Sequence, residues 1–570
     1  MTDIAKGRLV INPFGNGFVN LADDLDNVKV IYIPKKDLSF AINLDIVEVE
    51  YTQQPDGKYI GRVVNYTLVG REFIGRLHHT YKTDAFIYVS ELKKNLVAVP
   101  LAECNAAGVF LDKKNWVRLR ITSDTNMQLK GQFLEVLDDN VDTLVEKKFQ
   151  LTSVVESAGI PFDASPPINI QHRDLLDHQV FTIDPPSCQD ADDAFSIVHF
   201  APNDIRIYVH IADVASSINP SHPDFETIIM RGNTYYSANT NWPMIPAKYA
   251  NDICSILPNK MTKVITTEFK YDPSNKTVDY VAWYFSIIRS RCKYDYDTAD
   301  AQLATNGDLL TIYNSSLILK LQVDDFLINR ESPAHSMVKY WMIATNIVMC
   351  RELQLIWRVN PAPTDFDLLA SYITTYDAEF ATRWDKGDRK QLVEYSSSKN
   401  DSLLNYLVKM QLVKAKYTAS NGEHYGLGVD NYTHWTSPIR RAADLLNHCV
   451  AHGYTQLDLE KYLPAINYAE MVQDNIEAFI LSYRNGETAQ IGDILAARII
   501  GLSQYGITVY VEQLDSRYSV HISRLSKERL TYDDASKMLT SANCRFGLFD
   551  RITLRVAKVG IENMEFDVYI

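Results

Sequence analysis

Apolar and polar residues alternate in short runs over the first part of the chain, as expected for β-strands with one buried face. The runs at 85–89 and 116–121 show this alternation, and the run at 45–49 ends an earlier group. Glycine-containing turns separate the runs. Short strands at regular spacing predict small β-barrels, one over residues 1–69 and a second over residues 70–155.

The pattern changes in the middle of the chain. A segment rich in Pro, Ser and Asp, residues 156–170, is interpreted as a linker. From 171 to 486, apolar strands such as 205–211 occur together with longer helical patterns at 401–417 and 465–482. This mixture predicts an α+β body large enough to be a catalytic domain.

Strand patterns return at 487–570, with runs at 493–501 and 505–511, and predict a third small barrel. The most apolar long stretch is Met337 to Trp357, but charged residues interrupt it. It therefore predicts a buried helix and not a membrane span.

The composition is that of a soluble globular protein of several domains, with 46% hydrophobic and 22% charged residues among 570. The net charge of −14 argues against a protein that coats duplex nucleic acid non-specifically. Seven scattered cysteines without zinc-type spacing indicate reduced core thiols. Since the N-terminus has neither a signal-peptide nor a transit-peptide pattern, we expect a cytoplasmic protein.

Four aspartates lie close together between two apolar runs, 180–183 and 194–198. They are Asp184, Asp190, Asp192 and Asp193. Carboxylates crowded between buried segments repel one another and lose solvation, so cations are needed to hold them. Hard divalent ions such as Mg²⁺ or Mn²⁺ prefer oxygen ligands of this kind. The cluster predicts a metal-dependent phosphoryl-transfer centre, such as that of a nuclease, although a solvated acidic turn after Pro-Pro is the alternative.

Residues 182–194, T-I-D-P-P-S-C-Q-D-A-D-D-A, resemble the signature of the RNase II/RNase R (RNB-domain) family of 3′→5′ exoribonucleases. Further blocks of the chain match this family in order. They are residues 209–214 (V-H-I-A-D-V), 231–236 (R-G-N-T-Y-Y), 243–246 (P-M-I-P), 254–258 (C-S-I-L-P), 422–427 (G-E-H-Y-G-L) and 432–441 (Y-T-H-W-T-S-P-I-R-R). The resemblance covers essentially the whole chain, strongly in the middle and more loosely at both ends.

The resemblance implies an α+β RNB catalytic domain flanked by all-β OB-fold barrels, two cold-shock-like at the N-terminus and one S1-like at the C-terminus. It implies a hydrolytic 3′→5′ exoribonuclease that degrades single-stranded RNA to nucleoside 5′-monophosphates by a two-metal-ion mechanism. The expected cofactor is Mg²⁺, with Mn²⁺ as a substitute. We expect a monomer whose partner is single-stranded RNA, with no membrane association and no obligate protein partner.

The resemblance also implies roles for individual residues. The metal ligands would be Asp184, Asp190, Asp192 and Asp193, and the catalytic residues Asp192, Asp190 and Arg440. The RNA-binding residues would be Tyr236, Tyr296, Arg440, Arg441 and Trp435. Two tyrosines would stack on the last bases without choosing a sequence. For each tyrosine core packing is the alternative, and for Arg441 a structural role.

One departure from the family pattern bears on specificity. Lys339-Tyr340 stands where the family usually carries Glu-Glu, and that glutamate is associated with gripping the terminal ribose. Preference for RNA over DNA is therefore open, and an exonuclease that also degrades single-stranded DNA is one alternative. A catalytically weak or idle RNA-binding factor on the same fold is the other.

Overall fold

The computed structural model divides the chain into two compact units, residues 1–152 with 237–240, and residues 153–236 with 241–570. Residues described are 3–11, 16–22, 28–42, 45–55, 57–92, 95–106, 115–124, 128–152, 170–323, 331–386, 388–534, 536–559 and 564–569. The predicted linker 156–170 lies outside these ranges except for its last residue.

The first unit begins with a closed five-stranded barrel in the order β1-β2-β3-β5-β4. Its strands are β1 (Asp3–Ile11), β2 (Gly17–Ala22), β3 (Val28–Ile33), β4 (Ile46–Gln53) and β5 (Tyr59–Asn65). Alternate residues of these strands, Leu9, Ile31 and Val49 among them, fill the interior. Gly61 makes room for them, because a Cβ there would lie 2.6 Å from a methyl group of Val49.

A second closed barrel follows in the order β10-β8-β7-β6-β9. Its strands are β6 (Glu72–Tyr81), β7 (Asp84–Tyr88), β8 (Leu96–Pro100), β9 (Trp116–Ser123) and β10 (Leu129–Leu137), with helices α1 (Leu101–Ala106) and α2 (Val141–Phe149). Asn140 caps α2 by accepting from the backbone N–H of Asp142 at 2.9 Å. The two barrels confirm the all-β prediction for this part of the chain.

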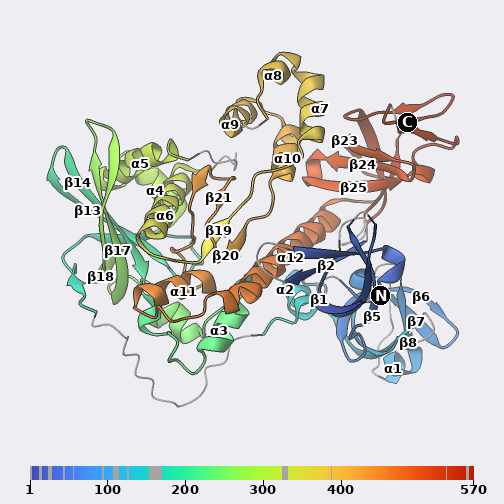
Figure 1. Ribbon diagram of the computed structural model, residues 1–570, viewed down its shortest axis with the longest axis horizontal. Helices are drawn as coiled ribbons and strands as arrows, with labels where there is room; N and C mark the ends of the chain where they lie inside the picture. The colour runs from blue at the N-terminus through green and yellow to red at the C-terminus, as the bar shows by residue number, and fades with distance from the viewer. Residues whose placement is uncertain are drawn as a thin grey trace. The chain divides into compact units, whose positions relative to one another are not determined.

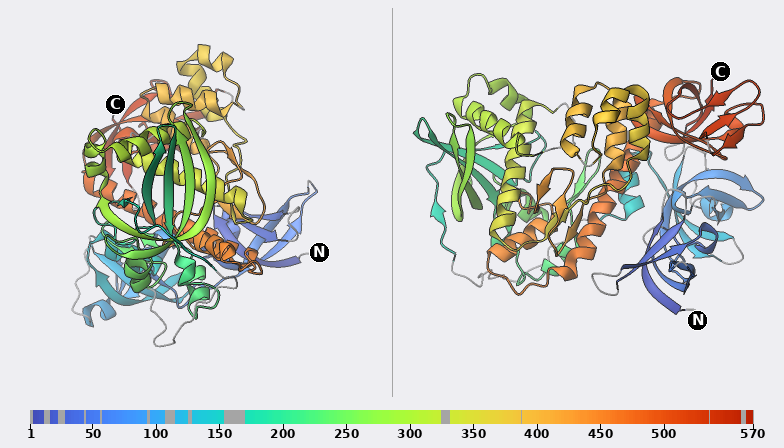
Figure 2. Two further views of the ribbon diagram at one scale, coloured as in Figure 1. Left: turned by 90° about the vertical axis from the view of Figure 1, so that its left-hand side faces the viewer. Right: turned by 45° about the horizontal axis from the view of Figure 1, so that its top comes forward.

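The second unit is built on a six-stranded sheet, in the order β11-β18-β12-β13-β14-β17, in which β17 also pairs with β18. The strands are β11 (Arg173–Asp174), β12 (Val180–Ile183), β13 (Asp193–Ala201), β14 (Asp204–Ala212), β17 (Met261–Asp272) and β18 (Thr277–Tyr294). Figure 2 shows this sheet with its long strands facing the viewer. The predicted α+β body is confirmed.

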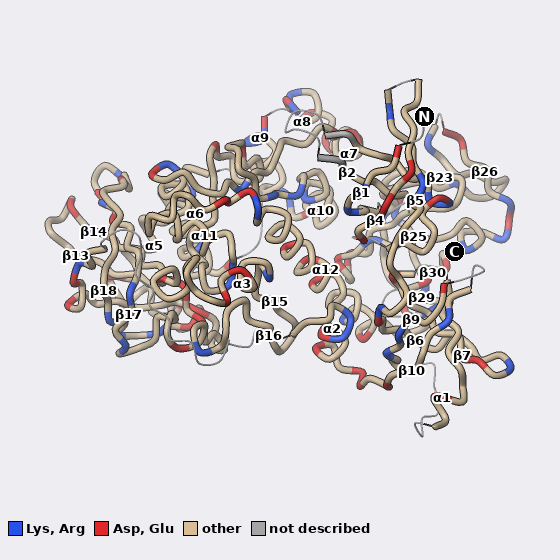
Figure 3. Tube along the Cα trace, turned by 60° about the horizontal axis from the view of Figure 1, so that its bottom comes forward, with Lys and Arg blue, Asp and Glu red and all other residues tan. Residues whose placement is uncertain are grey.

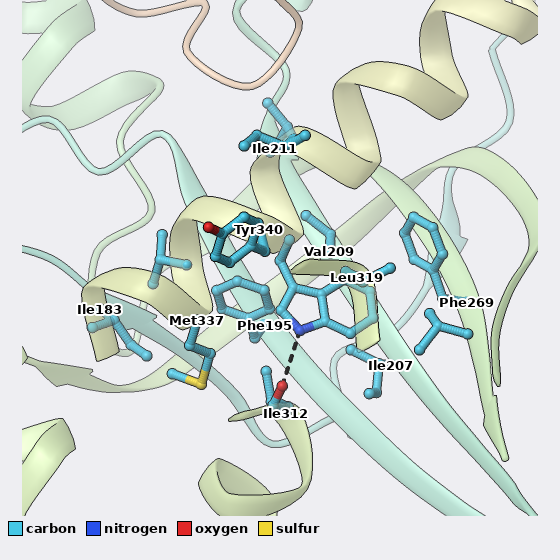
Figure 4. Close-up of a cluster of buried hydrophobic side chains, with 14 of the residues drawn as sticks. Ile183, Phe195, Ile207, Val209, Ile211, Phe269, Ile312, Leu319, Met337 and Tyr340 are labelled. Atoms are coloured by element: carbon cyan, nitrogen blue, oxygen red, sulfur yellow. Dashed lines mark hydrogen bonds between the residues drawn. The ribbon is translucent and has the colours of Figure 1, made fainter. Parts of the chain in front are cut away.

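Helices α4 (Tyr296–Gln302), α5 (Gly307–Lys320) and α6 (Pro333–Glu352) cover one face of this sheet (Figure 1). Phe195 and Ile207 project from the strands into the same cluster as Met337 (Figure 4). Trp341 is fully buried there, and its indole N–H donates to the carbonyl of Ile312 at 3.1 Å. The apolar stretch that begins at Met337 thus lies in a buried helix, as predicted, but the helix ends at Glu352 and Trp357 begins β19. Within the described residues, no helix has the length and hydropathy to cross a membrane.

Helices α3 (Phe225–Arg231), α11 (Ala442–Ala451) and α12 (Leu463–Thr488) pack against alternate strand residues such as Ala194 and Ala212, which face away from the first cluster. The short paired strands between these helices are β15 (Tyr235–Tyr236), β16 (Asn241–Trp242), β19 (Trp357–Val359), β20 (Lys416–Thr418), β21 (Glu423–His424) and β22 (Val429–Asp430). The prediction of one helix over 401–417 was wrong at its end. Helix α10 stops at Gln411 because the chain becomes extended at Leu412 and then pairs with β19.

The last part of the chain forms a five-stranded antiparallel sheet in the order β25-β24-β23-β29-β30. Its strands are β23 (Ile494–Ser503), β24 (Gly506–Val511), β25 (Ser516–His521), β29 (Arg551–Lys558) and β30 (Glu565–Val568), and β26 (Thr531–Asp533), β27 (Met538–Thr540) and β28 (Arg545–Phe546) form a small second sheet. Helices α7 (Asp367–Tyr376), α8 (Ala378–Arg383), α9 (Arg389–Ser398) and α10 (Ser402–Gln411) share a hydrophobic cluster with Tyr510 and Phe549 of this region. In both units, acidic and basic positions are interspersed along the elements (Figure 3).

Candidate active site

The acid cluster forms the connection between β12 and β13, here called the acid loop (residues 184–193). Asp184 follows the last residue of β12, and its backbone N–H donates to the carbonyl of Tyr294 on β18 at 3.1 Å. Asp193 begins β13, and the carbonyl of Asp192 accepts from the backbone N–H of Ala212 on β14 at 2.8 Å. Two central strands therefore fix both ends of the loop.

Two side chains from distant parts of the sequence hold the middle of the acid loop. The Ser255 hydroxyl accepts from the backbone N–H of Ala191 at 3.0 Å and donates to the carbonyl of Gln189 at 3.1 Å. The Lys293 ammonium donates to the carbonyl of Cys188 at 2.5 Å. Neither residue was predicted as part of the site, because a hydrogen bond to a loop carbonyl leaves no spacing pattern in the sequence.

Burial dominates the electrostatics of the acid loop. It raises the pKa of Asp192 and of Asp184 above the usual range, although Arg440 lowers the former. Burial and the nearby charge of Asp184 raise the pKa of Asp193 to about 8. The pKa of Asp192 is raised further by Asp190 and Asp193, so the four acids lie within one another's field. Burial and mutual repulsion thus disfavour the charged carboxylates, and a bound cation would favour them.

Two carboxylate oxygens of the loop have no hydrogen-bond partner among the described residues, Asp184 Oδ2 and Asp193 Oδ2, and both are buried. Between Asp184 and Asp190 lies the Cys188 thiol, whose sulfur is 3.6 Å from one oxygen of each. Burial and these two acids raise the pKa of Cys188, which keeps the thiol protonated. In the described part of the chain, no three His, Cys, Asp or Glu side chains converge in a group that could hold a metal ion.

Arg440 joins the acid loop from the segment that precedes α11. Its Nε lies 3.4 Å from Asp192 Oδ2, and one of its terminal nitrogens donates to the Ser437 hydroxyl at 2.9 Å. The other oxygen of Asp192 accepts from the backbone N–H of Ile439 at 2.9 Å. The Arg440 side chain is 43% exposed, so part of the guanidinium remains accessible to a ligand.

Arg441 has different surroundings from Arg440. Its guanidinium donates to Asp444 Oδ1 at 2.8 Å, and Asp444 is fully buried. Burial alone would lower the pKa of Arg441, but Asp444 beside it raises the pKa above its ordinary value. The same carboxylate oxygen accepts from the backbone N–H of Ser437 at 2.8 Å. These contacts favour the structural alternative for Arg441, which shapes the turn that carries Arg440.

The two predicted clamp tyrosines both lie beside the acid loop. Burial raises the pKa of Tyr236, and the backbone N–H of Thr234, two residues before it, donates to the carbonyl of Arg440 at 2.9 Å. The backbone N–H of Tyr236 donates to Gln473 Oε1 of α12 at 2.9 Å. Tyr296 is the first residue of α4, and burial, Asp193 and Asp184 raise its pKa in turn.

Trp435 is placed differently from these residues. It is fully buried, and its ring packs against His448 with centroids 4.1 Å apart. A side chain without exposed surface cannot contact RNA directly, so the expectation that Trp435 is an RNA-binding residue needs this correction. It packs beneath the turn that carries Arg440. No sequence pattern distinguishes a residue that packs under a site from one that contacts the RNA.

The family model described as "RNB domain" matches residues 172–312 and 306–456. Ribonuclease R of Aquifex aeolicus is 23% identical over 99% of this chain and 89% of its own length. The solved structure of Mycoplasma genitalium RNase R with ribose-methylated single-stranded RNA superposes with a TM-score of 0.80 at 18% identity, covering 99% of this chain and 100% of that one. A structure of yeast Ssd1, a pseudonuclease, superposes with a TM-score of 0.69 at 15% identity, covering 94% of this chain and 81% of that one.

The matched residues 172–456 make up half of the chain and contain the sheet, the acid loop and both arginines. The solved structures with a similar fold include one named as a ribonuclease and one named as a pseudonuclease, so the fold alone does not decide activity. The match, together with the acid loop, Arg440 and the two tyrosines in one place, shows that the chain belongs to the RNB domain family.

Proposed function

We propose that this exoribonuclease of the RNase II type degrades single-stranded RNA from its 3′ end to nucleoside 5′-monophosphates, with two divalent cations at the acid loop. The observation that carries the proposal is the meeting of the acids with Arg440 and the two tyrosines around one loop. The relatives from Aquifex aeolicus and Mycoplasma genitalium are named as ribonucleases, which supports the reaction class.

The residues present fit a hard divalent cation in their chemistry. Asp184 Oδ2 and Asp193 Oδ2 are buried without partners among the described residues, and burial raises the pKa of both residues, so a bound cation would favour their charged forms. Asp184, Asp190, Asp192 and Asp193 would hold the ions, all through oxygen, which suits Mg²⁺ and Mn²⁺. Because no three described side chains converge as they stand, binding would have to draw the carboxylates together. Bound cations supply an activated water and stabilise the leaving oxygen.

The remaining side chains bind and orient the RNA. Arg440 would contact the scissile phosphate, since its planar guanidinium matches two phosphate oxygens and its partner Asp192 holds its orientation. Tyr236 and Tyr296 would stack on the last bases, which holds the 3′ end at the acid loop without choosing a sequence. Ser437 fixes the far end of the guanidinium.

Two alternatives have specific support. The Ssd1 neighbour shows that this fold also occurs in a protein named a pseudonuclease, which supports an idle RNA-binding factor. The presence of all four aspartates and Arg440 argues against it. Lys339, where the family usually has glutamate, is paired with Glu331 at 3.2 Å. A cation at this position supports the second alternative, an exonuclease with relaxed sugar choice.

Degradation of a 5′-labelled single-stranded RNA tests the proposal. The wild type is compared with Asp192→Asn, with Mg²⁺ or Mn²⁺, and with a matched DNA oligomer in parallel. We expect a ladder that shortens from the 3′ end and a loss on the order of a thousandfold in the variant. Shortening of the DNA at a similar rate would favour relaxed sugar choice. Tight RNA binding without cleavage under either metal would reject the nuclease in favour of the binding factor.

A further inference from the structure

A stacked pair of rings lies at the edge of the site, formed by Tyr296 and His335. The ring centroids are 3.5 Å apart and the planes differ by 11°, so the rings lie face to face. Tyr296 is half buried and follows by two residues Tyr294, whose carbonyl accepts from the backbone N–H of Asp184 at 3.1 Å, whereas His335 is exposed. The pair therefore extends from the acid loop outward to solvent.

Both rings are held by the first turns of their helices. Tyr296 is the first residue of α4, where Asp295 caps the helix by accepting from the backbone N–H of Thr298 at 2.7 Å. His335 is in the first turn of α6, where Ser332 is the cap. The Ser332 hydroxyl lies 2.9 Å from His335 Nδ1, which fixes the rotation of the imidazole.

The two helices are also joined to each other at this point. Asp300 on α4 accepts from the backbone N–H of Ala334 in the first turn of α6 at 2.7 Å. Figure 1 shows α4 and α6 side by side next to the sheet. The separation between the rings is thus set by the frame of two helices and does not depend on a flexible loop.

Resting on the proposed function, we infer that His335 is a positioning residue for RNA: it holds the plane of the Tyr296 ring on which a base near the 3′ end stacks. A tyrosine ring that is free to rotate loses entropy when a base binds, and a ring already stacked on one face does not. The imidazole covers one face of Tyr296, and we place the base on the part of the half-buried ring that stays exposed. Because the ring pair touches the base and not the reacting phosphate, His335 acts on binding and not on the chemical step.

The test separates KM from kcat for a 5′-labelled single-stranded RNA in the full-length protein. We expect His335→Ala to raise KM about tenfold while kcat changes less than about twofold, because one base stack is weakened. His335→Phe should restore most of the loss, since phenylalanine keeps the flat face. His335→Leu, similar in bulk without an aromatic face, should stay as impaired as the alanine variant. His199→Ala is the matched control, because His199 is also exposed and lies on β13 away from the acid loop.

A double variant tests whether His335 acts through Tyr296. Tyr296→Ala combined with His335→Ala should be no worse than Tyr296→Ala alone. Additive losses, an unchanged KM in His335→Ala, or equal recovery by leucine and phenylalanine would overturn the inference. Tighter binding by His335→Ala would overturn it too, by showing that the imidazole occupies the place of a base. An inactive wild type would count against the proposed function. The His335 and Tyr296 variants would then be compared with the wild type by their RNA affinity.

Discussion

The acid loop and a second buried cluster in the same unit differ in the neighbours of their carboxylates. The second cluster consists of Asp213, His448 and His452, and the ring of His452 donates to Asp213 Oδ1 at 2.7 Å. Asp213 is 3% exposed and Asp192 is 5% exposed, so burial is nearly equal. Burial would raise the pKa of Asp213, but His452 outweighs it and the pKa is lowered. In the acid loop, where carboxylates face carboxylates, the pKa of Asp193 rises to about 8.

This difference separates a structural acid from a functional one. A buried carboxylate beside a donor contributes to folding, because its charged form is stabilised by the folded protein. A buried carboxylate beside other carboxylates opposes folding until something positive arrives. Carboxylates that face one another in this way lower the stability of the metal-free protein. Binding sites commonly carry such a cost in stability.

The largest expected effect comes from removing one charge from each cluster. Asp213→Asn should lower the free energy of unfolding by about 3 kcal/mol, because it breaks a buried pair and leaves His452 without its acceptor. Asp193→Asn should not lower it in metal-free protein, since burial already favours the neutral acid there. Urea denaturation with excess chelator measures both. Equal losses in the two variants would contradict the distinction between the clusters.

Added Mg²⁺ or Mn²⁺ completes this comparison. The cation should raise the unfolding midpoint of the wild type, because only the folded chain holds the four carboxylates near enough for a cation to draw them together. The rise should be much smaller in Asp193→Asn. In Asp213→Asn it should be retained, as long as the variant is folded.

The two neighbouring arginines give the next largest contrast. Arg440→Lys should reduce kcat about a hundredfold, because an ammonium cannot contact two phosphate oxygens in one plane. Arg441→Lys should reduce kcat only about tenfold, since Arg441 is turned toward Asp444 and not toward the acid loop. Single-turnover cleavage of the labelled RNA measures both. An equal loss in Arg441→Lys would show that both arginines contact the phosphate.

The sequence predicted the residues that would contact metal or RNA better than the residues that hold them in place. The acids, Arg440 and the tyrosines were predicted because their residue types and order match a family, and the apolar runs at 180–183 and 194–198 placed the acids between buried segments. Ser255 and Lys293 were not found, because each acts through a backbone carbonyl of the acid loop. Whether Arg441 and Trp435 face the ligand depends on where the turn before α11 points. That direction is set by Asp444, seven residues after Ser437, and not by local pattern.

Acid should destabilise the protein partly through His448. Burial lowers the pKa of this histidine to about 4, whereas the unfolded chain titrates near its ordinary 6.5. The stability that the neutral ring contributes to the folded protein is therefore fully present above about pH 6.5 and is lost as the pH falls toward 4. Asp193 has the opposite sign in metal-free protein, since its raised pKa favours folding as the pH falls. His448→Gln should make the loss of stability between pH 6.5 and 4 less steep, measured by urea denaturation at each pH. An unchanged slope would show that other groups carry the acid sensitivity.

The smallest expected effect is that of Trp435→Phe. The indole is fully buried and its N–H has no partner among the described residues, so phenylalanine removes volume together with an unsatisfied donor. These two changes oppose each other, and the free energy of unfolding should change by less than about 1.5 kcal/mol. RNA affinity should change less than about twofold, because the ring does not reach the surface. A larger loss of affinity at unchanged stability would mean that the turn carrying Arg440 opens when RNA binds and exposes the indole. Trp435 would then belong with Arg440 and not with the buried supports.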